Sequence, residues 1–413
     1  MRRAVCAEKE IRMVEFLNGK LDDETGPAIV FKEQNHTYTI GVIIPVKLQS
    51  LPEIQENLGQ QGLVAKLNQI RGVYAVRGFA EGLVKSPLRV SDLDLVLFTN
   101  PFKLNWVTAL KMLCNSGIPM RQSERRNEDP LVMCGGACLF NPEDIALGAD
   151  ICIIGDYRPV VEEVVRFVAS HAPSSRSELL GELSKERWRQ SGVYIPSAYS
   201  LSYAEDGHVV SMKPNTTVYA CKDPDIDSWP EFSRYVAHKP LKSKEAAVYG
   251  RKGGTFRLQL VEGCGQLCAM CVEGHYFHPP RFLDLVTVEQ VVERGVRIHA
   301  PTDIRLCLPF VPKTGYLRDV YRVVDDVLAR TEIQATVTVG SLRANDLNDA
   351  NLLSLIAAHG QRRLTLSPEV AEGEIAGLDL RRLIGKETVK DEDILAVVKK
   401  GKKVGIIHFL IHL

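Results

Sequence analysis

Short runs of Val, Ile and Leu alternate with amphipathic stretches in the first third of the chain. The strands predicted from these apolar runs are Thr39–Val46, Leu93–Phe98, Leu131–Cys134 and Ile151–Ile154. The helices predicted between and after them are Asn105–Cys114, Glu143–Leu147 and Val160–Val168. Alternation of this kind is typical of a mostly parallel sheet with helices on both faces. We therefore expect residues 1–171 to form a doubly wound, Rossmann-like α/β domain.

The alternation is lost over residues 172–254, which begin with the polar segment Pro173-Ser174-Ser175. Asp206-Gly207 lies between two short extended runs, Leu201–Tyr203 and Val209–Met212. An Asp-Gly pair between such runs is a strong signal for a β-hairpin. We expect a linker subdomain that contains this hairpin.

The alternation returns in residues 255–413 with greater clarity. The predicted strands are Phe256–Val261, Ile304–Leu308, Ile333–Val339, Arg363–Leu366 and Val404–Ile411. The predicted helices are Val288–His299, Leu317–Ala329, Asp349–His359 and Asp391–Lys400, the first with Thr287 and Gln290 as a capping box. Consecutive βα units predict a partial (β/α) barrel, although an open doubly wound sheet fits the same pattern. Because the sequence ends on the fifth strand, we expect a barrel truncated after that strand.

Charge and hydropathy narrow the possible partners. The 413 residues contain 51 Lys plus Arg and 51 Asp plus Glu, so the formal net charge is zero and there is no strong nucleic-acid signal. No apolar run approaches the ~20 residues that cross a membrane. No apolar core follows Met1-Arg2-Arg3, as a signal peptide would require. We therefore expect a cytoplasmic protein without a membrane partner.

The ten cysteines are too sparse for a disulfide scaffold, but three of them form a compact cluster. Cys264, Cys268 and Cys271 lie in the segment Glu262–His275, which reads EGCGQLCAMCVEGH and follows the first strand of the third region. Neighbouring glycines permit the turns that a loop around a metal cluster needs. An iron–sulfur cube is usually closed by four cysteines. Three ligands leave one iron open, which suits a catalytic cofactor.

Other interpretations of these cysteines remain open. Zinc could take the three thiolates together with His275 or His278. An electron carrier could recruit Cys307 as a fourth ligand, and three cysteines could also fall this close by chance. Cys134 and Cys138 share the first spacing but have no third partner nearby, so we expect no second cluster there.

The CxxxCxxC spacing in a loop after the first barrel strand resembles the radical S-adenosylmethionine (radical SAM) superfamily. The resemblance implies a [4Fe–4S] cluster whose open iron is chelated by S-adenosylmethionine. It also implies reductive formation of a 5′-deoxyadenosyl radical, with electrons from a donor such as a flavodoxin or ferredoxin. Met270 stands where the superfamily usually has an aromatic residue, and it can pack over an adenine. The implied activity is methyl transfer or another modification of an unidentified substrate.

Further segments resemble the radical SAM proteins that carry an N-terminal cobalamin-binding-like domain. The matching segments of the third region are Phe256–Cys264, Ser341–Arg343, Gly360–Glu369 and Asp391–Leu395. In that group, the N-terminal domain ends with the short motifs GG, NPE, AD and GD, in this order. The matching residues here are Gly135-Gly136, Asn141-Pro142-Glu143, Ala149-Asp150 and Gly155-Asp156. The linker segment Gly192–Ser197 also resembles that of these proteins.

When the site residues of that group are carried over one by one, the resemblance implies that Ser341, Arg343 and Glu369 face the cofactor. There they would form hydrogen bonds with the ribose hydroxyls and the methionine moiety. Two simpler roles compete: Arg343 as a surface ion-pair partner and Glu369 as a charge at a helix N-terminus. The glycine-rich motif that usually follows the second strand is not recognisable in Leu308–Gly315.

Cobalamin can bind here only without a histidine ligand from the N-terminal domain, because no histidine occurs between His36 and His171. The loop Cys134–Cys138 could approach a phosphate or a nucleotide tail, or could be a tight turn. Three functions therefore stand at this point. They are a radical SAM enzyme, a non-catalytic iron–sulfur or zinc protein, and a degenerate scaffold that binds a partner.

Overall fold

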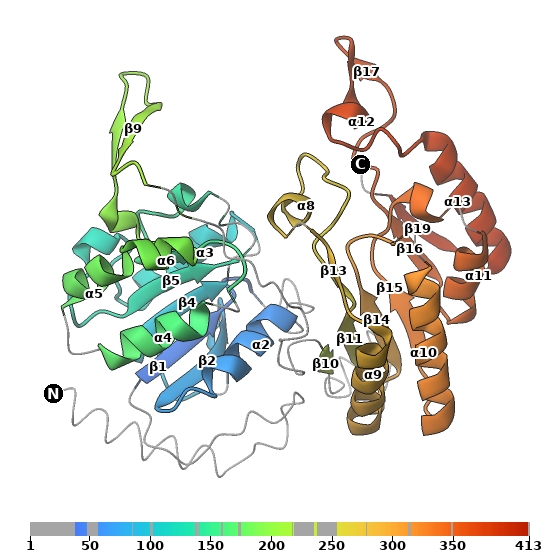
Figure 1. Ribbon diagram of the computed structural model, residues 1–413, viewed down its shortest axis with the longest axis horizontal. Coiled ribbons are helices and arrows are strands. Elements are labelled where there is room, and N and C mark those ends of the chain that lie inside the picture. The colour runs from blue at the N-terminus through green and yellow to red at the C-terminus, as the bar shows by residue number, and fades with distance from the viewer. Residues whose placement is uncertain are drawn as a thin grey trace. The chain divides into compact units, whose positions relative to one another are not determined.

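The computed structural model describes residues 38–47, 57–84, 86–99, 102–136, 139, 141–157, 160–171, 175–216, 218, 235–237, 254–277, 279–312, 315–347 and 350–411. The chain forms two compact units, Met1–Pro224 and Asp225–Leu413 (Figure 1). Each unit is described by itself below.

A seven-stranded sheet organises the first unit. Its strands are β1 (Tyr38–Ile43), β2 (Val73–Phe79), β3 (Gly82–Leu83), β4 (Leu95–Thr99), β5 (Leu131–Gly135), β6 (Ile151–Ile153) and β7 (Val193–Tyr194). They lie in the order β3-β2-β1-β4-β5-β6-β7, and only the pairs that include the edge strands β3 and β7 are antiparallel. The chain order reverses between β1 and β4, which is the topological switch point of a doubly wound sheet.

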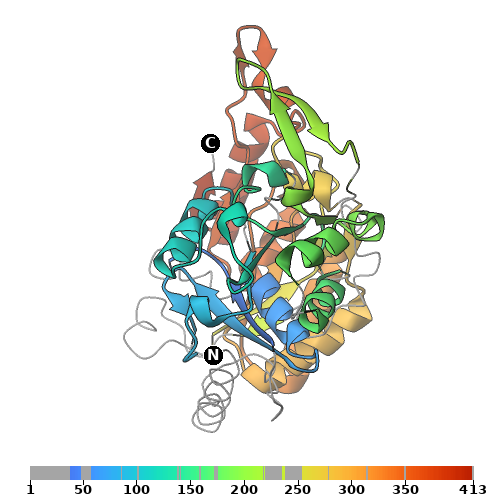
Figure 2. The same cartoon turned by 90° about the vertical axis from the view of Figure 1, so that its left-hand side faces the viewer.

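Helices cover both faces of this sheet (Figure 2). The helices are α2 (Leu58–Leu67), α3 (Asn105–Asn115), α4 (Val161–Ser170), α5 (Arg176–Leu183) and α6 (Glu186–Gln190), with short 3-10 turns at Val90–Asp92, Gln122–Glu124, Pro142–Asp144 and Pro196–Ala198. One core joins α2, α4, α5 and Trp188 of α6 to alternate residues of the strands, such as Ile40 and Leu97. The second core joins α3 to the opposite set, such as Val96 and Phe98. Two cores on opposite faces confirm the α/β class.

Residues 176–194, part of the segment that the sequence pattern assigned to the linker, contribute α5, α6 and β7 to this unit. The linker hairpin itself consists of β8 (Ser200–Tyr203) and β9 (Val209–Lys213), which pair antiparallel. The predicted hairpin is therefore confirmed, and Gly207 has the positive φ of +86° that its turn requires.

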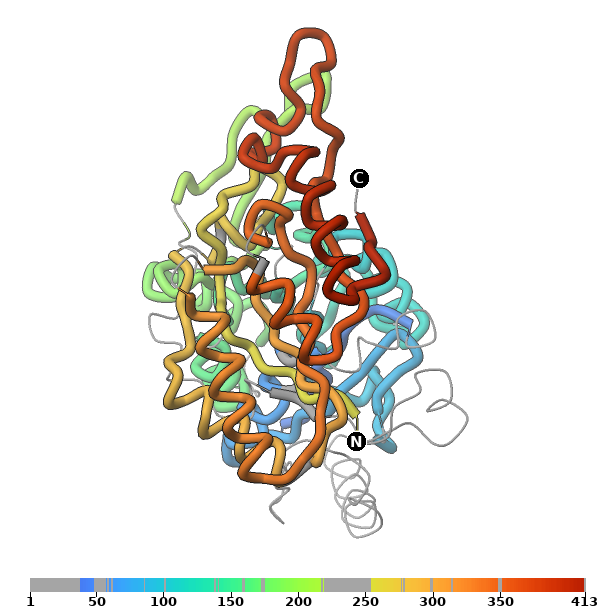
Figure 3. The backbone as a smooth tube through the Cα atoms, turned by 90° about the vertical axis from the view of Figure 1, so that its right-hand side faces the viewer, coloured from blue at the N-terminus to red at the C-terminus, as the bar shows by residue number. Residues whose placement is uncertain are grey.

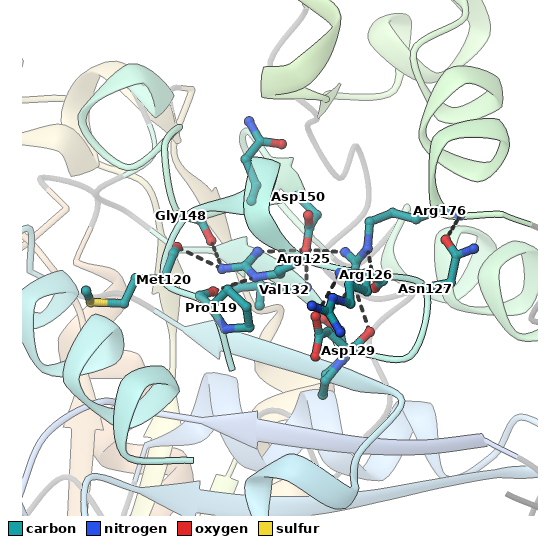
Figure 4. A network of polar contacts seen from close by, with 12 residues as sticks. Pro119, Met120, Arg125, Arg126, Asn127, Asp129, Val132, Gly148, Asp150 and Arg176 are labelled. Atoms are coloured by element: carbon teal, nitrogen blue, oxygen red, sulfur yellow. Dashed lines mark hydrogen bonds and ion pairs between the residues drawn. The ribbon is translucent and has the colours of Figure 1, made fainter. Parts of the chain in front are cut away.

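A buried ion-pair network links β5 and β6 to the loops beside them (Figure 4). Asp150 accepts hydrogen bonds from the Val132 N–H at 2.7 Å and from Arg125 Nη1 at 2.9 Å, and both charged side chains are fully buried. Arg176 Nη1 lies 2.9 Å from the same carboxylate. The remaining Arg125 nitrogens donate to the carbonyls of Pro119, Met120 and Gly148. One carboxylate thereby connects three segments of the fold.

Consecutive parallel strands organise the second unit, whose backbone path is traced in Figure 3. The strands are β10 (Tyr235–Ala237), β11 (Thr255–Gln259), β12 (Val261–Glu262), β13 (Arg281–Phe282), β14 (Asp303–Cys307), β15 (Thr336–Val339), β16 (Arg363–Leu366), β17 (Glu374–Ile375), β18 (Leu378–Asp379) and β19 (His408–Ile411). The pairs β11–β14, β14–β15 and β16–β19 are parallel, and a parallel bridge between Leu342 and Leu366 connects β15 to β16. Strand β10 pairs antiparallel with β11.

The helices of this unit are α8 (Val272–Tyr276), α9 (Leu285–His299), α10 (Tyr316–Thr331), α11 (Ala350–Ala358), α12 (Leu380–Leu383) and α13 (Asp391–Val404), with a 3-10 turn at Ala344–Leu347. A single hydrophobic core joins α9, α10, α11 and α13 to alternate strand residues. The order of βα units follows the sequence pattern, while the truncated (β/α) barrel stays a prediction.

Three predicted elements are wrong in detail. The expected helix Glu143–Leu147 is only the 3-10 turn Pro142–Asp144, and Gly148 shortly after it packs so closely against Trp106 that a side chain there would clash. Helix α9 begins at Leu285, since Asp284 accepts a hydrogen bond from the Thr287 N–H and caps the helix before the expected capping box. The last strand begins only at His408, because α13 continues to Val404 and ends at Gly405 with φ +96°.

No helix in the described part of the chain is both long enough and apolar enough to span a membrane.

The network around Asp150 predicts a strong effect of one substitution. Asp150→Ala should lower the free energy of unfolding of the first unit by about 3–5 kcal/mol, because two guanidinium groups lose their buried carboxylate. Urea unfolding followed by the fluorescence of the buried Trp106 and Trp188 measures it. Asp144→Ala is the control, because its pair with Lys103 is partly exposed and should cost no more than about 1 kcal/mol. Equal unfolding midpoints for the two variants would contradict the assigned role.

Candidate functional site

The three-cysteine loop lies between β12 and the short helix α8. Strand β13 returns alongside β12 and pairs with it antiparallel, so both ends of the loop are anchored. Cys264 and Cys268 are buried, and Cys271 is half-buried. The sequence therefore places three thiols on one short, anchored turn of chain.

Glycine is required where this loop turns back on itself. Gly263 has φ +76°, and a Cβ atom there would lie 1.9 Å from the carbonyl oxygen of Phe277. Gly274 is also tightly approached, since a Cβ atom there would lie 3.1 Å from the backbone of Leu267. No side chain could occupy the first position without moving the backbone, so the loop geometry depends on Gly263.

A distant segment holds the tip of the loop through main-chain contacts. The Ala269 N–H donates to the Ile384 carbonyl at 3.0 Å. Gly385, with φ +70°, approaches the backbone of Leu267 and Cys268 so closely that a Cβ atom would lie 3.2–3.4 Å from it. The segment after α12 therefore supports the middle cysteine from outside.

The thiols interact electrostatically. Burial raises the pKa of the Cys264 thiol, the N–H of Gln266 lowers it, and the neighbouring Cys268 and Cys271 raise it again. That N–H lies 3.4 Å from Cys264 Sγ. Burial also raises the pKa of Glu273, which accepts a hydrogen bond from the Gly263 N–H at 3.0 Å. A cationic metal centre would favour the thiolate forms that burial and the neighbouring cysteines disfavour.

This arrangement fits an iron–sulfur cube. The loop supplies three thiolates and an N–H···S hydrogen bond, which is one of the contacts that tune such clusters. Among the described residues no three Cys, His, Asp or Glu side chains converge on the position of a single metal ion. Convergence of that kind is not required by a cube, because each thiolate binds a different iron.

The residues that could serve as a fourth metal ligand are His275, His278 and Cys307. The ring of His275 contacts the Cys268 carbonyl through Nε2 at 3.0 Å. His278 lies outside the described residues. Cys307 is at the end of β14, in register with Gln259 of β11.

Arg343 lies beside the cysteine loop. Its guanidinium donates to the side-chain oxygen of Gln266 and contacts the Gly385 carbonyl at 3.5 Å. The residue is only 7% exposed, and its Nε has no hydrogen-bond partner. Arg343 is thus buried against the loop that carries the cysteines, whereas a surface ion-pair partner would be exposed.

Glu369 follows β16 and connects to the same region through Lys386. It has φ +70° and lies in a loop, and its carboxylate is 3.1 Å from Lys386 Nζ. Lys386 is 5% exposed, also donates to the Ser367 carbonyl, and directly follows Gly385. The chain thereby brings Glu369, Lys386, Arg343 and the cysteine loop into one region.

The other two expected cofactor residues are more exposed. Met270 is 50% exposed at the position before Cys271, and Ser341 is exposed after β15. Sequence reasoning missed Gln266 and Lys386. Gln266 lies inside the motif and could have been noticed, whereas nothing in the segment Gly385–Thr388 distinguishes a buried lysine from a solvated one.

In the first unit, Asp150 and Glu143 of the motifs carried over from the resemblance make structural contacts. Asp150 centres the network described above, and Glu143 accepts a hydrogen bond from the Tyr194 hydroxyl. Burial raises the pKa of the Cys134 thiol, which lies in β5 in register with Cys152. Cys138 lies outside the described residues.

The chain is similar to a known protein family and to a protein of another organism. Residues 82–196 match a family described as radical SAM proteins, N-terminal. Over 319 residues the chain is 22% identical to an uncharacterized protein of Methanocaldococcus jannaschii. That match covers 77% of this chain and 57% of the relative, so the chain spans little more than half of the relative's length. Residues 82–196 are therefore similar to the N-terminal domain of radical SAM proteins.

Proposed function

We propose that the chain is a radical SAM enzyme in which Cys264, Cys268 and Cys271 hold a [4Fe–4S] cluster. One observation carries the proposal. The three thiols share a glycine-wrapped loop beside the buried Arg343, in a chain whose residues 82–196 match the N-terminal domain of radical SAM proteins. The cluster and bound S-adenosylmethionine would supply a 5′-deoxyadenosyl radical on reduction.

The residues of the chain have distinct roles in this proposal. Arg343 offers a planar set of donors, which suits the carboxylate or ribose oxygens of the cofactor. Glu369 accepts hydrogen bonds from the cofactor, and Lys386 holds its carboxylate in place. Ser341 adds a hydroxyl group, and the exposed Met270 packs against the adenine. Burial of Cys264 and Cys268 shields these two side chains from water, while Cys271 is half-buried.

The proposal extends to a reaction class and an electron source. The outcome is methyl transfer or another modification of a substrate, with electrons from a reducing donor such as a flavodoxin or ferredoxin. Any cobalamin bound by the first unit takes no histidine ligand from residues 37–170.

A second candidate is a non-catalytic iron–sulfur carrier. It is favoured by Cys307, which lies at the end of β14 in register with Gln259, five residues before Cys264. A thiol beside the base of the loop could close the fourth iron and leave no position for a cofactor.

Replacing any one cysteine of the loop should abolish cluster assembly. After anaerobic reconstitution, Cys264→Ser, Cys268→Ser and Cys271→Ser should each lose the iron and sulfide that the unmodified chain binds, because two thiolates cannot retain the cube. Formation of 5′-deoxyadenosine after reduction should disappear with them. Cys114→Ser on α3 is the control and should match the unmodified chain, with a stability change within about 0.5 kcal/mol. Full cluster content in the three loop variants would refute the ligand assignment.

Cys307→Ser separates the enzyme from the carrier. In the enzyme, iron content and 5′-deoxyadenosine formation should both persist, because Cys307 is not a ligand. In a carrier, the variant should lose iron, and the unmodified chain should form no 5′-deoxyadenosine. Anaerobic iron analysis and product chromatography on both chains decide between them.

The close approach at Gly263 predicts a further loss. Gly263→Ala should strongly reduce cluster content, because the new methyl group meets the Phe277 carbonyl at 1.9 Å. Gly377→Ala is a matched control, since Gly377 has nearly the same φ of +75° and no atom within 4 Å of the new Cβ. It should cost only about 1–2 kcal/mol of backbone strain and retain the cluster. Similar iron content in both variants would show that the clash is irrelevant.

A further inference from the structure

Arg381 is a buried arginine in the short helix α12, and its side chain is only 1% exposed. Nε donates to the Val370 carbonyl at 3.2 Å, and Nη1 donates to the Val389 carbonyl. Nη2 donates to Asp391, and the carboxylate of Glu372 lies 3.8 Å from Nη1. One side chain thereby joins two segments of the chain, the loop after β16 and the segment after α12.

Each of these two segments carries a residue to which the proposed function gives a role at the cofactor. Val370 directly follows Glu369. In the other segment, the Val389 N–H donates to the Lys386 carbonyl at 2.9 Å, and the Lys386 N–H donates to the carbonyl of Arg381 itself at 2.7 Å. Because Lys386 Nζ is 3.1 Å from the carboxylate of Glu369, the contacts form a closed ring that begins and ends at Arg381.

The backbone of Glu369 depends on contacts of this kind. Its φ is +70°, a left-handed conformation that residues other than glycine adopt rarely. Such a conformation persists only where the surrounding structure holds it, and it is frequent at functional sites. The carbonyls on either side of Glu369 are both engaged, since Ser367 accepts from Lys386 Nζ and Val370 accepts from Arg381 Nε. The direction of the Glu369 side chain is therefore determined by Lys386 and Arg381 together.

The segment that Arg381 holds also contacts the cysteine loop and Arg343. The Ala269 N–H donates to the Ile384 carbonyl at 3.0 Å, and the Arg343 guanidinium lies 3.5 Å from the Gly385 carbonyl. A displacement of this segment would therefore change the surroundings of Arg343 as well as those of Glu369.

We infer that Arg381 is a positioning residue for S-adenosylmethionine, which acts through Glu369 and Lys386 and does not itself touch the cofactor. The inference rests on the proposed function, because the groups that Arg381 positions are the proposed cofactor contacts. Arginine suits this role, since its planar group presents donors to two carbonyls and a carboxylate at once, whereas lysine carries all its donors on one nitrogen.

Isothermal titration of S-adenosylmethionine into the anaerobically reconstituted chain, with the cluster oxidised, tests the inference without turnover. Arg381→Met should weaken binding by about ten-fold or more, because the charge-assisted contacts of the cofactor lose their fixed positions. Arg381→Lys, which keeps the charge, should recover part of the affinity. Both variants should retain the iron content of the unmodified chain, since β12 and β13 anchor the cysteine loop independently. Asp391 and Glu372 stay solvated without the guanidinium, because their side chains are 52% and 39% exposed.

Arg382→Met is the matched control, because Arg382 is the next residue of α12 and is exposed. It should bind the cofactor as the unmodified chain does. Unchanged affinity in Arg381→Met, equal weakening by Arg382→Met, or loss of iron from both Arg381 variants would each overturn the inference. An unmodified chain that binds no cluster or no cofactor contradicts the proposed function instead, so the two failures are distinguished.

Hydrogen–deuterium exchange on the same reconstituted samples checks the structural step. The N–H groups of Lys386 and Val389 should exchange faster in Arg381→Met than in the unmodified chain, because the ring of contacts through Arg381 is opened. In Arg382→Met their exchange should not change. Equal protection of this segment in Arg381→Met and in the unmodified chain would show that Arg381 does not hold it, and would overturn the inference.

Discussion

The close approach of Gly263 to the carbonyl of Phe277 is the constraint on which the site depends. The 1.9 Å that would separate a Cβ atom from that oxygen excludes every side chain at this position. The contact closes the loop on itself between β12 and β13, and so it determines where the first cysteine leaves the strand. The other supports act on a loop that is already closed: Gly274 lies against Leu267, and the segment after α12 lies against Cys268. Three thiols are thereby held on one short loop, where burial and the neighbouring cysteines disfavour ionisation of Cys264.

Main-chain contacts provide most of the support for the cysteine loop. The side chains of the loop therefore remain available for chemistry. Ala269 bonds the Ile384 carbonyl through its N–H, so the residue at this position is not specified by the contact. Arg343 and Lys386 differ, since their charged groups are buried beside the loop and interact mainly with carbonyl or amide oxygens. Burial of a charged group is costly unless hydrogen bonds compensate for it. Arg343 Nε lacks such a bond, which is consistent with a ligand that completes its partners.

Much of this arrangement could be predicted from the sequence, because strand and helix periods are local properties. Strands such as β5 and β14 and helices such as α10 follow from apolar runs, whereas the cluster indicated by the cysteine spacing stays a prediction. The errors occur where a particular side-chain contact, and not the apolar pattern, determines where a helix or strand begins or ends. Helix α9 starts early because Asp284 is available as a cap, and the expected helix at Glu143 is a 3-10 turn followed by the close contact of Gly148 with Trp106. The role of Asp150 and the burial of Lys386 depend on partners up to 26 residues away, which no local pattern reveals.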